Sequence, residues 1–435
     1  MVVLLGVAGT ACGSKPTTRG GTEVVPGIQL RFGDEIRALD LAVEGDRIAH
    51  VVWSEQKRSA DSRQFDAPRL LCRSKDLESG RWNATVALPG GESSPLRAIV
   101  AGNALHVIVG THLRHLISVD RGATWTELDS LVKSGPASRT WDVVGSGDAV
   151  LLVSINPESV TGQFARADTL ALWTARIGNS ASEKPVRVAT LHRPDFGDHV
   201  IRLFATPDSI YLFDGVPQGL ATPGMALNTY RPGTRISVAR SGDGGRTWSP
   251  LTEIKGLPDW GAPDGSIHDL AAAQGHGKIV AFYAGREVFA FESQSDGRWS
   301  APAPACPASK GLFVSPSTVS SVCAASTEGA GVLLWIDTRF ARTDRPFASP
   351  LSGQPDWSNN DVLMLPLSRF DGGDWRGRAR DPQRLTHDLS YAERLRVRAG
   401  EHYVYALWSG LRVVGKHLDS FQSPPRLFFA RLPMN

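Results

Sequence analysis

Short apolar runs recur along the chain in pairs, and a Gly, Asn or Asp turn separates the two members of each pair. The first pair is residues 36–43 with 48–53, and the second is 96–100 with 104–109. Runs of β-branched and aromatic residues bounded by turn residues are typical of antiparallel strands. Further pairs lie at 141–144 with 149–153, 200–205 with 209–213, 267–272 with 278–283, 318–325 with 331–336, and 391–397 with 402–408. The chain is therefore expected to be all-β and built from about seven similar units.

Each unit continues with a third strand, such as residues 235–240 or 288–292, and a fourth strand completes it. Units of this kind are typical of β-propeller blades. We predict a single propeller of four-stranded blades over residues 22–435, with seven blades and six as the alternative. Segment 23–32 precedes the first unit without a partner, and 425–432 ends the last unit as its third strand. The N-terminal strand is expected to complete the last blade, which removes two exposed edges.

Two octapeptides, Ser118 to Trp125 and Ser241 to Trp248, share the pattern Ser-x-Asp-x-Gly-x-Thr-Trp, and weaker copies lie at 74–82, 293–299 and 368–375. The Asp can accept backbone N–H groups across a tight turn, the Gly can adopt a turn conformation that other residues resist, and the Trp adds apolar surface. The pattern resembles the Asp box of sialidase-like β-propellers. Because the boxes fall between third and fourth strands, at the periphery, we assign them a structural role.

Both ends of the chain also resemble sialidases. Arg37-Ala38-Leu39, followed by a Gly turn, a second strand and Glu55 to Arg58, is similar to the opening of the first sialidase blade, although the family motif reads Arg-Ile-Pro. Ser390-Tyr391-Ala392 and the later Phe- and Arg-rich strand are similar to the last blade. The resemblance implies that Tyr391 is the nucleophile and that Arg37 binds the substrate carboxylate. The alternatives are a surface ion pair for Arg37 and a core position for Tyr391.

The resemblance implies four further site positions. The acid/base Asp falls at Asp61 or Asp66, with Asp61 preferred, and Asp264 stands where the family has a Glu that activates the Tyr. Arg286 matches one further arginine, and the last arginine of the triad is Arg339, Arg342 or Arg345.

This set of residue types suits a sialic acid, whose anomeric carbon carries a carboxylate. Arginines can hold that carboxylate by charge-assisted hydrogen bonds, whereas a carboxylate nucleophile would be repelled by it. A Tyr deprotonated by an acidic neighbour attacks instead, and an Asp protonates the leaving oxygen. The shorter Asp264 would stand about one methylene further from the Tyr than the family's Glu.

Two functions therefore follow from the sequence. One is a noncatalytic surface module that binds a glycan or a protein, and the other is an exo-α-sialidase-type retaining glycoside hydrolase. The incomplete Arg-Ile-Pro motif, the seventh blade and the unassigned third arginine favour the binding module, and the fold alone does not decide. Convergence of the arginines on Tyr391 would distinguish the two.

Composition narrows the range of partners. The 47 Lys and Arg residues nearly balance the 44 Asp and Glu residues, which gives no reason to expect a nucleic-acid or polybasic membrane partner. No apolar run is long enough to span a bilayer. No Cys/His spacing matches a metal site and no Gly-rich phosphate loop follows a strand, so we expect neither a metal nor a cofactor.

Residues 1–21 resemble a bacterial lipoprotein signal and tether, with an apolar stretch that ends at Cys12. We expect export to the cell envelope or secretion, with Cys12 as the lipidation site and the lipid as the only membrane contact. An exported chain could join Cys306 to Cys323, and the alternative is that Cys72, Cys306 and Cys323 are buried thiols.

Overall fold

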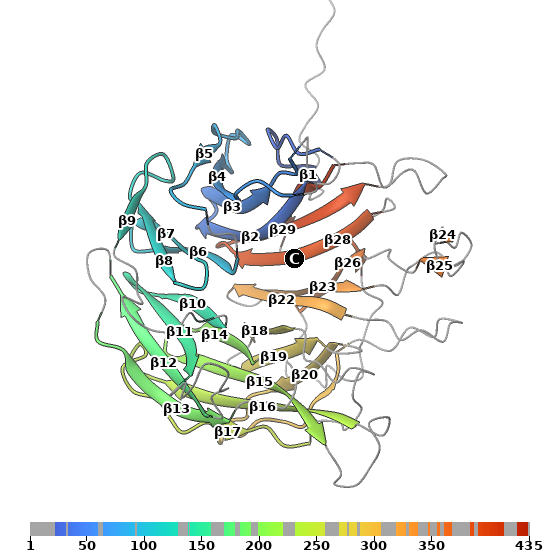
Figure 1. The fold of residues 1–435 in the computed structure, drawn as a ribbon. Coiled ribbons are helices and arrows are strands. Elements are labelled where there is room, and N and C mark those ends of the chain that lie inside the picture. Colours follow the sequence, from blue (N-terminus) through green and yellow to red (C-terminus); the bar gives the residue numbers. More distant parts are fainter. Residues whose placement is uncertain are drawn as a thin grey trace, which may run out of the picture.

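The computed structural model describes residues 22–31, 34–59, 64–91, 94–128, 138, 140–157, 169–178, 183–192, 199–220, 231–256, 269–275, 278–284, 288–305, 319–327, 330–337, 347–348, 355–356, 361–367, 383–386, 390–412 and 424–433. Their secondary structure is all β, in seven four-stranded sheets arranged as a propeller (Figure 1). The seven-bladed prediction is therefore confirmed, and the six-bladed alternative is wrong. Among these residues, no helix is long and apolar enough to cross a membrane.

Each blade begins with its inner strand, and the following strands lie progressively outward. Blade 1 contains β2 (Glu35–Glu44), β3 (Ile48–Gln56), β4 (Arg69–Asp76) and β5 (Val86–Ala87); blade 2 contains β6 (Leu96–Ala101), β7 (Ala104–Val109), β8 (Arg114–Ser118) and β9 (Thr126–Leu128). Blade 3 contains β10 (Trp141–Ser146), β11 (Ala149–Pro157), β12 (Thr169–Ile177) and β13 (Val186–His192); blade 4 contains β14 (Val200–Ala205), β15 (Ile210–Leu220), β16 (Arg231–Ser241) and β17 (Thr252–Glu253). Blade 5 contains β18 (Asp269–Gly275), β19 (Lys278–Ala284), β20 (Val288–Glu292) and β21 (Ala303–Pro304); blade 6 contains β22 (Val319–Thr327), β23 (Ala330–Asp337), β26 (Asp361–Pro366) and β27 (Gln383–Arg384). Blade 7 contains β28 (Ser390–Ala399), β29 (Tyr403–Arg412), β30 (Arg426–Pro433) and β1 (Thr22–Val24), and a small sheet of β24 (Phe347–Ala348) and β25 (Pro355–Asp356) falls between β23 and β26 in the chain.

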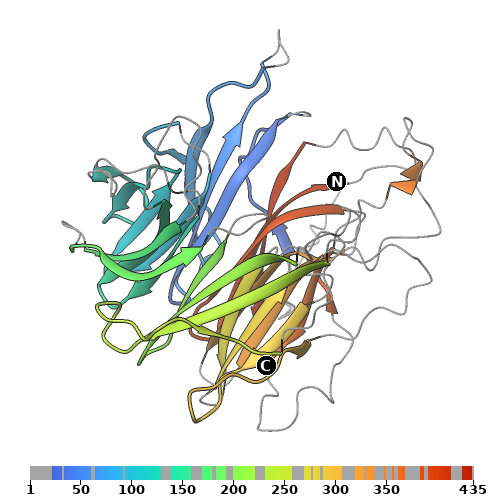
Figure 2. The same ribbon diagram turned by 60° about the horizontal axis from the view of Figure 1, so that its bottom comes forward.

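The seven inner strands surround the propeller axis. Each contacts the inner strand of the next blade, and β28 of blade 7 contacts β2 of blade 1, so the ring is closed. Figure 2 shows the blades fanning outward from these strands. The core lies between the blades, because successive residues of a strand face opposite sides of its sheet. Val51 packs in the cluster shared with blade 7 and its neighbour Val52 in the cluster shared with blade 2.

Closure by the N-terminal strand is confirmed. In β1, Thr22 pairs with Ala430, and the backbone N–H of Val25 then donates to the carbonyl of Leu427 at 2.9 Å. The paired strand is shorter than the predicted segment 23–32. Pro26 has no N–H to donate, and Gly27 adopts a left-handed φ of +78°, so the chain leaves the sheet at this turn.

The two octapeptides adopt the same turn, and both lie between a third and a fourth strand as predicted. In the first, Asp120 Oδ1 accepts the N–H of Thr124 at 2.8 Å, and Trp125 Nε1 donates to the carbonyl of Gly122 at 3.1 Å. In the second, the matching distances from Asp243 and from Trp248 are 2.9 and 3.1 Å. The same bonds at both sites show that the shared residues specify the turn.

Each octapeptide turn packs against the preceding blade. A Cβ added to Gly245, whose φ is +90°, would lie 2.6 Å from Leu151 of blade 3. A Cβ on Gly122 would lie 3.3 Å from the hydroxyl of Ser74 in blade 1. Trp248 Nε1 also lies 3.2 Å from the hydroxyl of Thr174 in blade 3. These contacts agree with a structural role.

The weaker copies are less regular. Isolated bridges pair Lys75 with Trp82 and Ser293 with Trp299, which joins the two ends of each copy. The third copy, at 368–375, lies outside the described residues.

Candidate functional site

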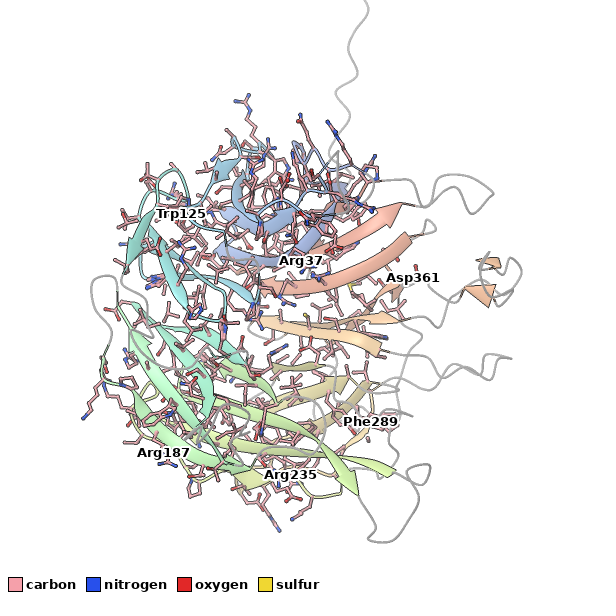
Figure 3. The ribbon with its side chains drawn as sticks, viewed as in Figure 1. Arg37, Trp125, Arg187, Arg235, Phe289 and Asp361 are labelled. Atoms are coloured by element: carbon pink, nitrogen blue, oxygen red, sulfur yellow. The ribbon has the colours of Figure 1, made fainter. Side chains whose placement is uncertain are left out.

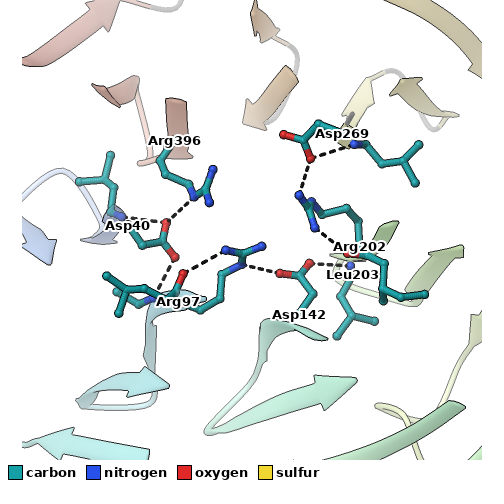
Figure 4. Close-up of polar contacts among 12 residues, drawn as sticks. Asp40, Arg97, Asp142, Arg202, Leu203, Asp269 and Arg396 are labelled. Atoms are coloured by element: carbon teal, nitrogen blue, oxygen red, sulfur yellow. Dashed lines mark hydrogen bonds and ion pairs between the residues drawn. The ribbon is translucent and has the colours of Figure 1, made fainter. Parts of the chain in front are cut away.

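A ring of charged side chains surrounds the propeller axis. In five consecutive blades the inner strand places one charged residue there: Asp40, Arg97, Asp142, Arg202 and Asp269. The sign alternates from blade 1 to blade 5 (Figure 4). Because a charge inside a core is costly unless it is paired, each of these residues needs a partner nearby.

The arginines find their partners in the next blade. Arg97 Nε donates to Asp142 Oδ1 at 2.6 Å, and Arg202 forms an ion pair with Asp269. Both guanidinium groups also donate to the carbonyl of the residue that precedes them, at 3.0 and 2.7 Å. Each arginine is thus fixed at two points, one in its own blade and one in the next.

The aspartates also reach forward by one blade. Asp40 Oδ2 accepts the backbone N–H of Ala98 at 2.8 Å, and Asp142 Oδ2 accepts that of Leu203 at 2.9 Å. Asp269 Oδ2 accepts a backbone N–H of blade 6 at 3.4 Å. The ring therefore joins the inner strands of neighbouring blades, in addition to the apolar packing between them.

Seven blades cannot alternate two signs around a closed ring, because seven is odd. Blade 6 breaks the alternation with the neutral Cys323, whose Sγ donates to the carbonyl of Leu395 at 3.2 Å. Blade 7 contributes two arginines that both face Asp40. Arg398 Nη2 lies 3.2 Å from each carboxylate oxygen, whereas Arg396 Nε lies 3.6 Å from Oδ1. We call these seven charged residues, four arginines and three aspartates, the charge ring.

Burial and neighbouring charges set the pKa values in the ring. Burial alone would raise the pKa of Asp142, but the charges of Arg97 and Arg202 outweigh it and the pKa is lowered. Burial would lower the pKa of Arg97, but its partner Asp142 raises it. The pKa of Arg396 is lowered, first by burial and then by the charge of Arg97. Burial raises the pKa of Cys323 to about 11, so this thiol is neutral.

A cavity of about 750 Å³ lies along the axis, between the charge ring and the C-terminal ends of the inner strands. Except for Val322, every inner-strand residue that lines it is a ring residue, is Cys323, or follows one of these in its strand. Its walls are mainly apolar, with Ile99, Val144, Phe204 and Ala324 among them, and Thr327 lies at the far end of β22. The volume is in the usual range for small-molecule sites. We call this space the axial cavity.

The structure places Arg37 away from the axial cavity. Arg37 is the extra residue of a bulge in β2, where the register shifts between Ile36 and Ala38. Its side chain, labelled in Figure 3, is 45% exposed. Its Nη1 donates to Glu35 Oε2 at 2.6 Å. This contact is an exposed ion pair, and the role of Arg37 as a substrate ligand stays a prediction. Arg37 also precedes Asp40 in β2, so it lies on the opposite side of the charge ring from the cavity.

Tyr391 lies near the start of β28, paired in the sheet with Leu411, as the sequence predicts for an inner strand of the last blade. The starts of β28 and β2 are neighbours, because Arg394 Nε donates to the carbonyl of Arg37 at 3.0 Å. Arg394 is itself the extra residue of a bulge in β28. The two best-matched sialidase positions therefore belong to adjacent strands at one end of the axis.

The other predicted site residues lie outside the described residues, namely Asp61, Asp264, Arg286, Arg339, Arg342 and Arg345. Asp66 is described, and its backbone N–H donates to the carbonyl of Lys57 at 2.9 Å in the connection between β3 and β4. The role of each of these residues stays a prediction.

The cysteines are described in part. Cys72 and Cys323 are free thiols, and burial raises the pKa of Cys72 to about 12. Cys12 and Cys306 lie outside the described residues, so lipidation of Cys12 stays a prediction. The bridge from Cys306 to Cys323 also stays a prediction, and its formation would replace the hydrogen bond that the Cys323 thiol donates to Leu395. In the described part of the chain, no three His, Cys, Asp or Glu side chains are grouped closely enough to hold a metal ion.

The charge ring was not predicted, although the sequence carries a signal for it. The inner-strand segments Leu39-Asp40-Leu41, Leu96-Arg97-Ala98 and Trp141-Asp142-Val143 each place one charge between apolar residues. In a strand buried on both faces, such a charge requires a partner from another strand. The change of sign from one unit to the next indicates that the partners come from neighbouring blades.

No family model and no curated protein matches the chain. Among solved structures, the phage phi92 endosialidase is 10% identical, with a TM-score of 0.42, over 96% of this chain and 69% of that chain. The Trypanosoma rangeli sialidase in complex with sialic acid is 14% identical, with a TM-score of 0.38, over 95% of this chain and 59% of that chain. The β-propeller domain of the Trilobed protease from Pyrococcus furiosus is 9% identical, with a TM-score of 0.43, over 92% and 95%. Similarity this distant carries no argument about activity.

Proposed function

We propose that the chain is a noncatalytic propeller that binds a glycan or a protein at its surface. The observation that supports this is the pairing of three described arginines with protein carboxylates. Arg97 and Arg202 are each held by a carboxylate of the next blade, and Arg37 pairs with Glu35 at an exposed position. An arginine already paired with a protein carboxylate is a poor clamp for a substrate carboxylate, because the pair must first be broken.

The alternative is an exo-α-sialidase-type retaining hydrolase, and one observation favours it. The bond from Arg394 to the carbonyl of Arg37 brings the start of β28, with Tyr391, beside the start of β2. In that reaction Tyr391 would attack the anomeric carbon, and arginines would hold the carboxylate. The proposed roles are Asp264 as activator, Asp61 as acid/base, and Arg37, Arg286 and Arg339 as substrate ligands.

A fluorogenic sialoside separates the two functions. We expect the full chain to bind immobilised surface glycans or a surface protein, with no release of the fluorophore. Turnover that Tyr391→Phe lowers by orders of magnitude would replace the binding proposal with the sialidase. Turnover that Tyr391→Phe leaves unchanged would also contradict a noncatalytic propeller and would assign the nucleophile to another residue.

The proposal includes export, with Cys12 as the point of lipid attachment. If Cys12 is modified, metabolic labelling with a radioactive or clickable fatty acid should mark the wild-type chain and leave the Cys12→Ser variant unlabelled. The variant should also move from the membrane fraction to the soluble fraction, because a lipid is the only membrane contact we expect. Equal labelling of the two chains would show that Cys12 is not the modified residue.

A further inference from the structure

The axial cavity combines an unbalanced positive charge with apolar walls. Four arginines and three aspartates make up the charge ring, which leaves one positive charge in excess. The excess belongs to blade 7, where Arg396 and Arg398 share Asp40. It arises because blade 7 supplies two arginines, whereas Cys323 in blade 6 supplies no charge.

Of the two arginines in blade 7, Arg396 has the longer contact with Asp40. Its Nε is shielded from water and has no hydrogen-bond partner, and the distance of 3.6 Å to Asp40 Oδ1 is too long for a hydrogen bond. Nη1 donates to the carbonyl of Leu395 at 2.7 Å. The side chain is 22% exposed and lines the axial cavity, so a ligand in the cavity meets the rest of the guanidinium group and not Nε.

The negative charges are less accessible. Asp40 is fully buried behind the two arginines and does not line the cavity. Asp142 and Asp269 do line it, but each is already paired with an arginine of the preceding blade. A ligand at the blade 7 side of the ring therefore meets guanidinium groups.

The walls beyond the ring define the rest of the ligand. Ile99, Val144, Phe204, Ala324 and Val397 present apolar surface toward the axis. The hydroxyls of a sugar would lose their hydrogen bonds to water against such walls, whereas an apolar body would be stabilised there. A volume of about 750 Å³ is enough for a compact ligand of this kind.

We propose that the axial cavity binds an amphiphilic monoanion, with its anionic head on Arg396, beside Arg398, and its apolar body along the walls. This site is separate from the surface site of the proposed function and does not depend on it.

Two probes with one apolar body test the proposal. 8-Anilinonaphthalene-1-sulfonate carries an anionic head, and N-phenyl-1-naphthylamine is the same ring system without it. Both fluoresce more strongly in apolar surroundings, so titration of the folded full chain gives two dissociation constants. We expect saturable binding of both, tighter for the sulfonate. Arg396→Gln should weaken the binding of the sulfonate about tenfold, because it removes one charge-assisted hydrogen bond. The dissociation constant of the neutral probe should stay unchanged.

Two further variants keep the test decisive. Lys255→Gln also removes one positive charge, but at a residue just after the outer strand of blade 4 whose side chain is 82% exposed. This variant should change neither dissociation constant. Thr327→Trp should weaken the binding of both probes, because the indole side chain occupies space in the cavity and leaves the charge ring unaltered. Thermal unfolding of each variant checks that the fold is intact, since partly folded chains also bind the sulfonate.

The proposal is overturned if the folded wild-type chain binds neither probe. It is equally overturned if Arg396→Gln leaves the sulfonate constant unchanged, or if Thr327→Trp leaves both constants unchanged. Glycan or protein binding by the same samples would continue to support the proposed function in each of these cases, so the two failures can be told apart.

Discussion

Asp142→Ala should lower the free energy of unfolding by about 3–5 kcal/mol, because it leaves a buried guanidinium without its partner. Asp142 accepts Arg97 Nε at 2.6 Å and the backbone N–H of Leu203 at 2.9 Å, which ties blade 3 to the blades on both sides. The side chains of Arg97 and Asp142 are only 10% and 7% exposed, so water from the axial cavity can replace the lost carboxylate only in part. Urea denaturation followed by tryptophan fluorescence measures the change as a lower midpoint at constant slope.

A double variant shows whether the cost comes from the unpaired charge. Arg97→Met combined with Asp142→Leu removes both charges and keeps apolar volume, so it should recover most of the stability lost in Asp142→Ala. Glu253→Ala breaks the exposed pair with Lys255, and the cost should stay below about 1 kcal/mol. A loss in Asp142→Ala no larger than that in Glu253→Ala would show that the charge ring does not stabilise the propeller.

The strand pairs could be predicted because their signal is local. Residues 36–43 and 48–53 were expected as a pair, and the structure has Glu35–Glu44 and Ile48–Gln56 as β2 and β3. A turn between two apolar runs determines which strands are neighbours within a blade. Repetition of the pair then gives the blade count, since each blade must bury its two faces against others.

The bulges could not be read from the same pattern. β2 and β28 each contain one extra residue, Arg37 and Arg394, and both bulges lie near the starts of the strands. The extra residue of a bulge is left unpaired, and its side chain points in a direction that regular alternation would not give. Beyond the bulge, the alternation of inward and outward side chains resumes. For this reason the match of Arg37 to a family motif did not determine where its guanidinium points. Arg394 adopts a φ of +44°, a conformation that the sequence around it does not indicate.

The candidate sites depend on relations between blades, which are long-range. The charges at Asp40, Arg97 and Asp142 are visible in the sequence, but the pairing of Arg97 with the next blade depends on which face of β6 it occupies. The family resemblance placed most other site residues in connections between strands, where no periodicity fixes a position. Sequence therefore predicted the scaffold well and the arrangement of side chains on its axis poorly.

Deleting residues 1–31 should destabilise the whole propeller, because blade 7 would lose its outer strand, which comes from the opposite end of the chain. The deletion removes β1 and the buried side chains of Val25 and Leu30, which are 1% and 6% exposed. Burial of two such side chains stabilises a fold by about 3–6 kcal/mol, a large part of the stability of a typical domain. It also leaves β30 as an open edge, which favours association between chains. Thermal unfolding and light scattering measure the two effects.

Matched variants separate loss of the closing strand from loss of chain. A chain that lacks only residues 1–21 keeps every described contact of β1 and should unfold at the wild-type temperature. Val24 and Val25 are adjacent residues of one type, 43% and 1% exposed. Val25→Ala should cost about 2 kcal/mol, since two methyl groups leave the core shared by blades 7 and 1, whereas Val24→Ala should change stability by less than about 0.5 kcal/mol. If the chains that lack residues 1–31 and 1–21 unfold at the same temperature, the prediction is wrong. The propeller would then be equally stable with only three strands in blade 7.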